Sequence, residues 1–135
     1  DPLASATLTQ HDAGWRVYDG GDLKPTLDIT VRNGSSSSIG LSFKARFIDG
    51  TGRLVREPYE SCDIPAGTSL GPIRFFTFIS YKDTFQSDEE FREALSNPNH
   101  PNHPTKWKVD LLAAAKGASD NEYRVIYSSA LNIRR

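Results

Sequence analysis

The chain has 135 residues, which fits one domain, and its 16 basic and 17 acidic residues give a net charge of −1. Proteins that bind nucleic acid usually carry a basic excess that neutralises phosphates, so this balance argues against nucleic acid as a partner. Hydrophobic residues make up 37% and charged residues 24% of the chain, which argues against disorder. We expect a single domain over residues 1–135 that needs no cofactor.

Cysteine content and hydropathy leave the compartment open. Cys62 is the only cysteine, so an internal disulfide is impossible, and both reducing and oxidising environments are compatible with the chain. No apolar run reaches the roughly 20 residues that a membrane-spanning helix needs. The beginning of the chain is what an excised signal peptide or a truncation would leave. We therefore expect membrane association only through a removed or missing anchor.

Apolar and polar residues alternate with a period of two in the first half of the chain. The segment 25–32 alternates in this way, and so does the segment 41–47, as half-buried strands do. The Asn-Gly-Ser sequence at 33–35 lies between them and tolerates the positive φ of a turn. The two segments therefore predict a β-hairpin.

Further short strands are separated by Gly, Pro and Asp turn signals. The stretch 70–80 is the most apolar, and its aromatic and β-branched content predicts a strand buried on at least one face. Near the end, Tyr123, Val125, Tyr127 and Leu131 are expected on one face of a closing strand. The remaining predicted strands cover residues 4–10, 15–18, 53–56, 59–64 and 106–111.

One helix is predicted over residues 87–96. Ser87 precedes Glu90 by three residues, which is the spacing of a reciprocal capping box, and a proline follows that would stop the helix. Phe91 and Leu95 are four residues apart, so both are expected on the inner face of the helix.

The pattern of seven to nine short strands with closely spaced turns predicts a mainly β fold. We expect an antiparallel, immunoglobulin-like β-sandwich with the single helix inserted between late strands. The paired cysteines of antibody domains are missing from this chain. A partly open barrel is the alternative architecture.

Residues 27–67 run through a strand with an Asn-Gly turn, an alternating strand ending in Asp-Gly-x-Gly, a charged strand and then Ile-Pro-Ala-Gly at 64–67. This order resembles the small β-sandwich modules of bacterial envelope proteins and lipoproteins, the FxLYD type and its relatives. At the family's characteristic position this chain has Ala-Arg-Phe-Ile-Asp at 45–49, where only Asp49 matches outright. The resemblance covers about a third of the chain. It implies a non-enzymatic, extracytoplasmic module that is periplasmic, envelope-anchored or secreted.

The Pro-Asn-His-Pro-Asn-His-Pro run at 98–104 is the most unusual segment of the chain. His100 and His103 could approach a common Zn²⁺, but a zinc site needs a third and preferably a fourth ligand. Nothing places the remaining histidine nearby. We therefore predict a recognition loop and no metal site, with Asn99, His100, Asn102 and His103 facing solvent.

No motif specifies a reaction, so no catalytic residue and no enzymatic activity are expected. The Asp-Gly-Thr-Gly sequence at 49–52 is similar to the Asp-Thr-Gly of aspartic proteases, but the extra Gly breaks the spacing and favours a hairpin turn. Cys62 lies beside Asp63, which would raise the pKa of the thiol and make it a poor nucleophile. A metal-dependent hydrolase using His100 and His103 is the least favoured function.

Two binding functions remain. The leading hypothesis is a non-catalytic module that engages a protein partner through the loops around 86–105 or through an edge strand. The alternative is a carbohydrate-binding module in which Trp15, Tyr59 and Trp107 form an exposed aromatic platform that stacks on sugars. The second hypothesis requires that at least one tryptophan is largely accessible to solvent.

Overall fold

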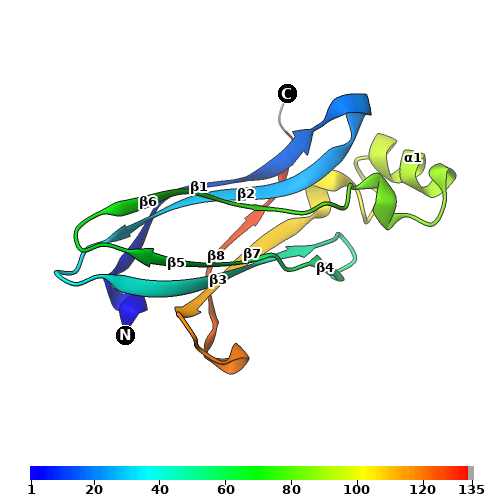
Figure 1. Cartoon of the computed structure of the whole chain (residues 1–135). Helices are drawn as coiled ribbons and strands as arrows, with labels where there is room; N and C mark the ends of the chain where they lie inside the picture. The colour runs from blue at the N-terminus through cyan, green and yellow to red at the C-terminus, as the bar shows by residue number, and fades with distance from the viewer. Residues whose placement is uncertain (134–135) are drawn as a thin grey trace.

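The computed structural model describes residues 1–133, in which two β-sheets pack face to face and one α-helix projects from an end of the sandwich (Figure 1). The predicted immunoglobulin-like sandwich is confirmed, and α1 (Asp88–Ser96) lies between late strands as expected. The strands are β1 (Ala6–Val17), β2 (Leu23–Asn33), β3 (Ile39–Ile48), β4 (Leu54–Arg56), β5 (Tyr59–Ile64), β6 (Ser69–Phe76), β7 (Lys108–Ala115), β8 (Arg124–Ala130) and β9 (Asn132–Ile133). The 3-10 turns are η1 (Pro2–Ser5), η2 (Asp19–Gly21), η3 (Lys82–Thr84), η4 (Pro104–Lys106) and η5 (Asp120–Glu122).

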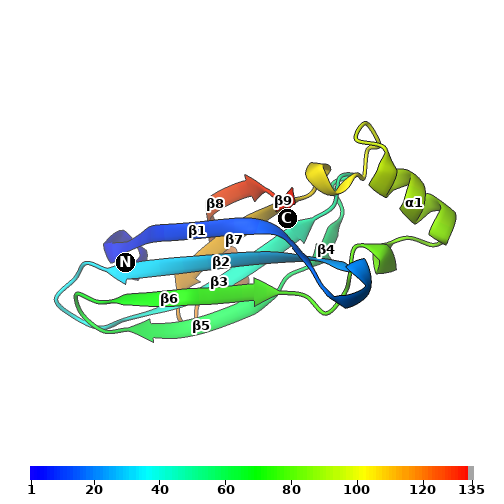
Figure 2. The same cartoon turned by 90° about the horizontal axis from the view of Figure 1, so that it is seen from above.

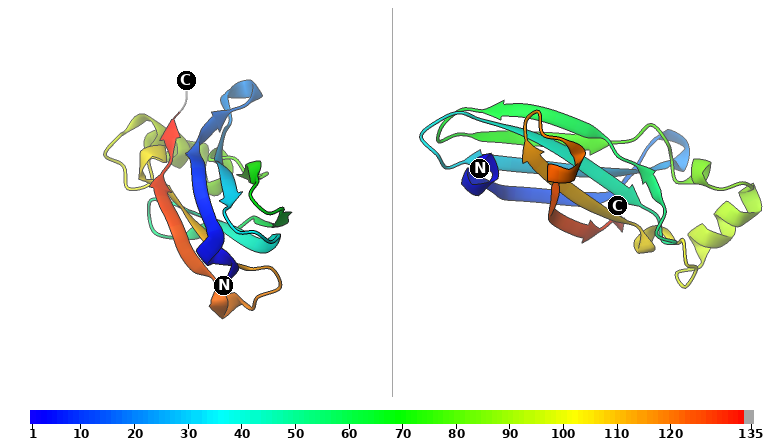
Figure 3. Two further views of the ribbon diagram at one scale, coloured as in Figure 1. Left: turned by 90° about the vertical axis from the view of Figure 1, so that its left-hand side faces the viewer. Right: turned by 90° about the horizontal axis from the view of Figure 1, so that it is seen from below.

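One edge strand of each sheet, β6 of sheet A and β5 of sheet B, runs along the same side of the sandwich. Sheet A has the order β6-β2-β1-β9, and sheet B has the order β4-β3-β7-β8 with β5 also paired to β3. Figure 2 shows β6 beside β5 along this side. On the opposite side β1 and β8 lie next to each other, and β9 makes a short parallel pair with β1 (Figure 3). All other strand pairs in the described residues are antiparallel.

The alternating segments of β2 and β3 form the centre of the core, as their pattern predicts. Leu27, Ile29 and Val31 on β2 are buried, and so are the alternating apolar residues of β3. The prediction for the N-terminus was wrong in one respect, because the two expected strands form one continuous strand, β1. Antiparallel pairing with β2 continues through the polar residues 10–12, which lack the apolar pattern that identifies a strand in the sequence.

Two expectations about buried faces were right only in part, since one face of β6 packs on the core as expected through the half-buried Ile73 and the buried Phe75. The apolar stretch 70–80 is a strand only as far as Phe76, and within the stretch Phe75 is buried while Phe78 is 87% exposed. β6 is an edge strand, so side chains beyond its end have no neighbouring strand to cover them. Val125 is exposed although Leu131 is buried, because a bulge opposite Leu111 and Leu112 interrupts the alternation of β8.

A buried aromatic cluster joins the sandwich to the helical segment. Trp15 and Trp107 are 0% and 1% exposed, with ring centroids 4.8 Å apart. Tyr81 packs edge-on against both, at 5.5 Å from Trp15 and 5.9 Å from Trp107. Phe85 and Phe91 extend the cluster toward α1. The predicted aromatic platform is therefore wrong for both tryptophans: they fill the core, where they provide more apolar contact than at the surface.

The helix begins as its capping sequence predicts. Ser87 accepts a hydrogen bond from the Glu90 backbone N–H at 3.2 Å. The predicted inner face was half right, because Phe91 packs on the aromatic cluster whereas Leu95 is 38% exposed. Ala94 is the buried residue instead. Phe91 and Ala94, three residues apart, share the face that points to the core. The small side chain of Ala94 lets the helix approach the aromatic rings closely.

The burial of both tryptophans predicts weak quenching of their fluorescence. Since the chain has two tryptophans and both are sealed in the aromatic cluster, acrylamide should quench the folded protein far less than the chain unfolded in urea. Stern–Volmer titration under the two conditions provides the measurement. Equal quenching in both states would contradict the buried cluster.

Candidate functional site

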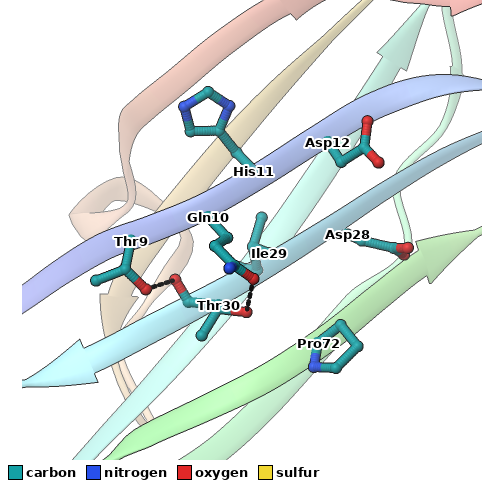
Figure 4. Close-up of a pocket in the computed structure, with 8 residues that line it drawn as sticks. All are labelled: Thr9, Gln10, His11, Asp12, Asp28, Ile29, Thr30 and Pro72. Atoms are coloured by element: carbon teal, nitrogen blue, oxygen red, sulfur yellow. Dashed lines mark hydrogen bonds between the residues drawn. The ribbon is translucent and has the colours of Figure 1, made fainter.

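A polar hollow lies on the outer face of sheet A, over β1, β2 and β6 (Figure 4). It has a volume of about 560 Å³ and is open to solvent along its length. Most of its lining side chains are exposed or half-buried and carry hydroxyl, amide, imidazole or carboxylate groups. The lining residues are Thr9, Gln10, His11, Asp12, Asp28, Ile29, Thr30 and Pro72.

Two bulges meet at the centre of this hollow. Between Leu8 and Gln10 the register of β1 against β2 shifts, which makes Thr9 an extra residue on β1. Between Ile29 and Val31 the register of β2 against β6 shifts as well. Both irregularities flank Thr30 on the central strand. Since bulges bend a strand and re-aim its side chains, their coincidence shapes a depression in a face that would otherwise follow a regular twist.

Gly71 makes the second bulge sterically feasible. A Cβ atom at this position would lie 2.4 Å from Thr30 Oγ1 and 2.8 Å from Thr30 Cα, so only glycine allows β6 to approach β2 this closely. Pro72 follows directly and forms one rim of the hollow. The Gly-Pro pair inside an apparent strand was a sequence signal for a bulge, and the sequence reasoning missed it.

Short hydrogen-bonded chains order the polar side chains of the hollow. The Thr9 hydroxyl donates to the Thr30 carbonyl at 3.3 Å, and the Thr30 hydroxyl donates to Gln10 Oε1 at 3.3 Å (Figure 4). In the second bond Gln10 accepts through its side-chain oxygen. The NH₂ group of the same side chain is a hydrogen-bond donor. The neighbouring strands β1 and β2 thus present both donors and acceptors at the surface.

Two carboxylates lie opposite each other at the other end of the hollow. Asp12 and Asp28 are direct partners in the β1–β2 register. Arg16 donates to Asp28 at 2.9 Å from β1, and Arg74 donates to it at 2.9 and 3.2 Å from β6. The two guanidinium groups thereby balance the charge of Asp28 and offset the repulsion that like charges exert across a strand pair.

The Pro/His loop is a packed structural element, contrary to expectation. Asn99 is exposed as predicted, but His103 is only 8% exposed, and His100 and Asn102 are half-buried. The Nδ1 atom of His103 lies 2.8 Å from the Thr105 hydroxyl and caps the start of η4. The Nδ1 atom of His100 accepts a hydrogen bond from the Asn102 backbone N–H at 3.0 Å. The histidines are therefore used to shape the loop.

Hydrogen bonds hold this loop against the 49–52 turn and the aromatic cluster. The Asn102 side chain accepts a hydrogen bond from the Gly50 N–H at 2.9 Å, and the Asn102 carbonyl accepts one from the Tyr81 hydroxyl at 2.8 Å. The indole N–H of Trp15 donates to the Pro104 carbonyl at 3.0 Å. Glycine is required at position 50, where a Cβ would lie 2.0 Å from the Pro101 carbonyl oxygen. The turn itself confirms the hairpin interpretation of Asp-Gly-Thr-Gly.

The open edge of the sandwich carries an apolar patch that sequence reasoning did not identify. Phe76 and Phe78 pack edge-on at 5.5 Å, and both are exposed. Beside them lies a cleft of about 340 Å³ between the end of β6 and the link from β4 to β5. We call this surface the edge patch, and it comprises Arg56, Glu57, Pro58, Phe76, Thr77, Phe78 and Ile79.

Tyr59, the third residue of the predicted platform, is separate from the other two. It is 53% exposed on β5, whereas both tryptophans lie in the core. Its hydroxyl lies 3.1 Å from the Ser42 hydroxyl, and hydrogen bonds with Ser42 and Ser61 lower the pKa of Tyr59. The structure therefore does not bring the three predicted aromatic residues together.

The groups considered for catalysis or metal binding are dispersed. Among residues 1–133, no group of three or more His, Cys, Asp or Glu side chains could hold a metal ion. Cys62 is half-buried, and burial together with the neighbouring Asp63 raises the pKa of its thiol, in agreement with the expected lack of activation. His11 stacks on Tyr127 with ring centroids 4.4 Å apart. In the same residues, no helix has the length and apolar character needed to cross a membrane.

The sandwich is similar to part of several solved glycosidase structures. A β-glucuronidase of Bacteroides uniformis matches with a TM-score of 0.51 at 9% identity, covering 93% of this chain and 12% of that protein. A β-glucuronidase from glycoside hydrolase family 2 matches with a TM-score of 0.54 at 16% identity, covering 93% and 11%. A calcium-binding mutant of Bacteroides uniformis β-glucuronidase 2 matches with a TM-score of 0.53 at 10% identity, covering 92% and 12%.

At these identities the likeness concerns the fold alone. The chain spans about 11–12% of the length of the enzymes it matches, so it corresponds to one small part of each. No protein-family model and no curated protein sequence matches the chain.

The hydrogen bond from Tyr81 to the Pro/His loop predicts that Tyr81→Phe destabilises the fold. Removing the hydroxyl leaves the half-buried carbonyl of Asn102 without this donor, which should lower the free energy of unfolding by about 1 kcal/mol. Tyr18→Phe is the matched control, because Tyr18 is exposed. Urea denaturation of both variants measures the difference. Equal stability of the two variants would contradict a stabilising role for the hydrogen bond from Tyr81 to Asn102.

The close approach of β6 to β2 at the second bulge predicts that Gly71→Ala destabilises the fold. The added methyl group would collide with Thr30, and relieving the clash should destabilise the protein by about 1–3 kcal/mol. Gly34→Ala is a suitable control, since a Cβ there would meet its nearest atom at 3.6 Å. Thermal unfolding should show a lower midpoint for Gly71→Ala alone.

Proposed function

We propose that this chain is a non-catalytic β-sandwich module that binds a protein partner through the edge patch. The observation that carries the proposal is the exposure of Phe78, which is 87% accessible beside Phe76 and an apolar cleft. Clustered aromatic residues at a free sheet edge are an interaction surface, because burying them against a partner removes apolar area from water. Aromatic side chains of this kind often dominate the binding energy of interfaces.

The edge strand itself limits how a partner can attach. Pro72 has no backbone N–H, so the first part of β6 cannot offer a continuous ladder to an added strand. Such a proline protects an edge against unspecific pairing. The following residues 73–76 have no proline and lead directly into the edge patch. A partner that extends sheet A would therefore pair with this second part of β6 and contact Phe78.

The structural neighbours support a role as one part of a larger assembly. In the β-glucuronidases the same fold accounts for about 11–12% of a long chain. In our proposal the edge patch is the apolar surface that a neighbouring domain or protein covers. The partner in this proposal is therefore a neighbouring domain of the same polypeptide or a separate protein.

The non-catalytic part of the proposal is supported by how the reactive side chains are used. His103 caps a 3-10 turn, His100 shapes its own loop, and the Cys62 thiol has a raised pKa. These groups serve the fold and are not poised as nucleophile and base. An extracytoplasmic location is also proposed, and it is supported by the resemblance of residues 27–67 to envelope modules.

Photo-crosslinking tests the edge patch directly. Replacing Phe78 by p-benzoylphenylalanine in the native protein, in its own cells, should give crosslinks to one defined peptide segment of a partner protein or neighbouring domain. The matched control carries the same probe at Val125, which is exposed on β8. Mass spectrometry of the crosslinked peptides identifies the segment.

The comparison of the two probe positions decides the outcome. A segment that is recovered from position 78 and not from position 125 supports the proposal. Crosslinking that is equally scattered from both positions, or absent from position 78, would show that the edge patch has no partner and would overturn it.

A further inference from the structure

We propose that the hollow on the outer face of sheet A is a binding site for a neutral carbohydrate. This site is distinct from the edge patch and is independent of the protein partner proposed above. It lies on β1, β2 and the bulged first part of β6, and none of its lining residues belongs to the edge patch. Three properties of the hollow carry the inference: its shape, its chemical groups and its charge.

The shape of the hollow suits a ligand that lies along the surface. Its volume of about 560 Å³ falls within the range of roughly 300–1,000 Å³ that small-molecule sites have. The hollow is open to solvent, and its lining residues come from three neighbouring strands (Figure 4). One or two rings of an oligosaccharide can rest in such a depression while the rest of the chain extends into solvent.

The chemical groups of the hollow match the hydroxyls of a sugar. A sugar hydroxyl both donates and accepts hydrogen bonds, so its site needs donors and acceptors side by side. Gln10 and Thr30 are direct partners across β1 and β2, and their amide and hydroxyl groups supply both functions. Opposite residues in a sheet lie about 5 Å apart, which is the scale on which one ring presents its hydroxyls.

An apolar surface is available for the other face of the ring. The pyrrolidine ring of Pro72 forms one rim of the hollow, and Thr9 and Thr30 contribute methyl groups near its centre. Apolar ligands would leave the surrounding polar groups without partners. The hollow therefore favours a ligand that carries many hydroxyls and a modest apolar face.

The charge distribution favours a neutral ligand. Arg16 and Arg74 both direct their guanidinium groups to Asp28, at distances of 2.9 to 3.2 Å, and thereby use their charge within the protein. An anionic sugar would have to displace Asp28 from one of these arginines and then lie beside that carboxylate, which is electrostatically unfavourable.

Folding alone does not account for this surface. Two bulges meet there, and two arginines are needed to offset the repulsion between carboxylates that face each other across a strand pair. Bulges are frequent next to functional sites because they re-aim side chains. The outer face of sheet A therefore accepts local costs to hold a particular set of polar groups in place.

Affinity electrophoresis tests the site with defined probes. The protein is run in native gels that contain mixed-linkage β-glucan, arabinoxylan or galactomannan, with polygalacturonate as the anionic comparator. At least one neutral polysaccharide should retard the wild type, whereas polygalacturonate should not. Gln10→Ala and Thr30→Val should each weaken the dissociation constant about five- to tenfold, as expected for losing one hydrogen bond.

Matched variants separate this site from other causes of retardation. Gln86→Ala changes the only other glutamine of the chain, outside the hollow, and should bind as the wild type does. Phe78→Ser should also keep full binding, so failure of the edge-patch proposal leaves this test unaffected. Unchanged thermal midpoints for Gln10→Ala and Thr30→Val establish that these variants fold.

Each outcome of these experiments either supports or overturns the proposed site. Retardation by a neutral polysaccharide that is lost in Gln10→Ala and kept in Gln86→Ala supports the site. Absence of retardation by all three neutral polysaccharides overturns it, as does binding that is insensitive to both hollow variants. Retardation by polygalacturonate alone would also overturn the assignment, because it would show that the hollow prefers an anion.

Discussion

Three aromatic rings join parts of the chain that lie far apart in sequence, and the end of the sandwich depends on them. Trp15 comes from β1, Trp107 precedes β7, and Tyr81 belongs to the long connection between the sheets. Each ring is fully or almost fully buried. Hydrogen bonds from Trp15 and Tyr81 to backbone carbonyls then fix the Pro/His loop. The cluster thus holds the irregular segment between β6 and β7 on the sandwich, and burial within it raises the pKa of the Tyr81 hydroxyl.

Two further surfaces of the sandwich are available for binding. The edge strand β6 runs beside β5 along one side of the sandwich, and Phe76 and Phe78 remain exposed at its end. The outer face of sheet A carries the polar hollow around Thr30. One surface is apolar and the other is polar, so they are suited to different ligands. A module of this kind can contact a protein along its edge while a hydrated ligand occupies its face.

Sequence patterns predicted local structure well and contacts between distant segments poorly. Alternation at Leu27, Ile29 and Val31 identified a strand and its buried face, and the Ser87–Glu90 spacing identified the start of α1. The same reasoning placed Trp15 and His103 at functional positions, although the fold buries both. Neither error had a local signal. Whether an aromatic or imidazole side chain is covered depends on which distant segment packs on it.

The sequence by itself determined the β-sandwich class, the main strands, the single helix and its cap, because these follow from side-chain periodicity and turn chemistry within short windows. Only the tertiary structure decided which strands became edges and where bulges coincide. Phe75 and Phe78 have the same chemistry, yet one is core and the other is the most exposed aromatic of the edge patch. Thr30 is likewise an ordinary strand residue until β1 and β6 place their bulges on both sides of it. Strand order and register are properties of long-range pairing, and no local pattern contains them.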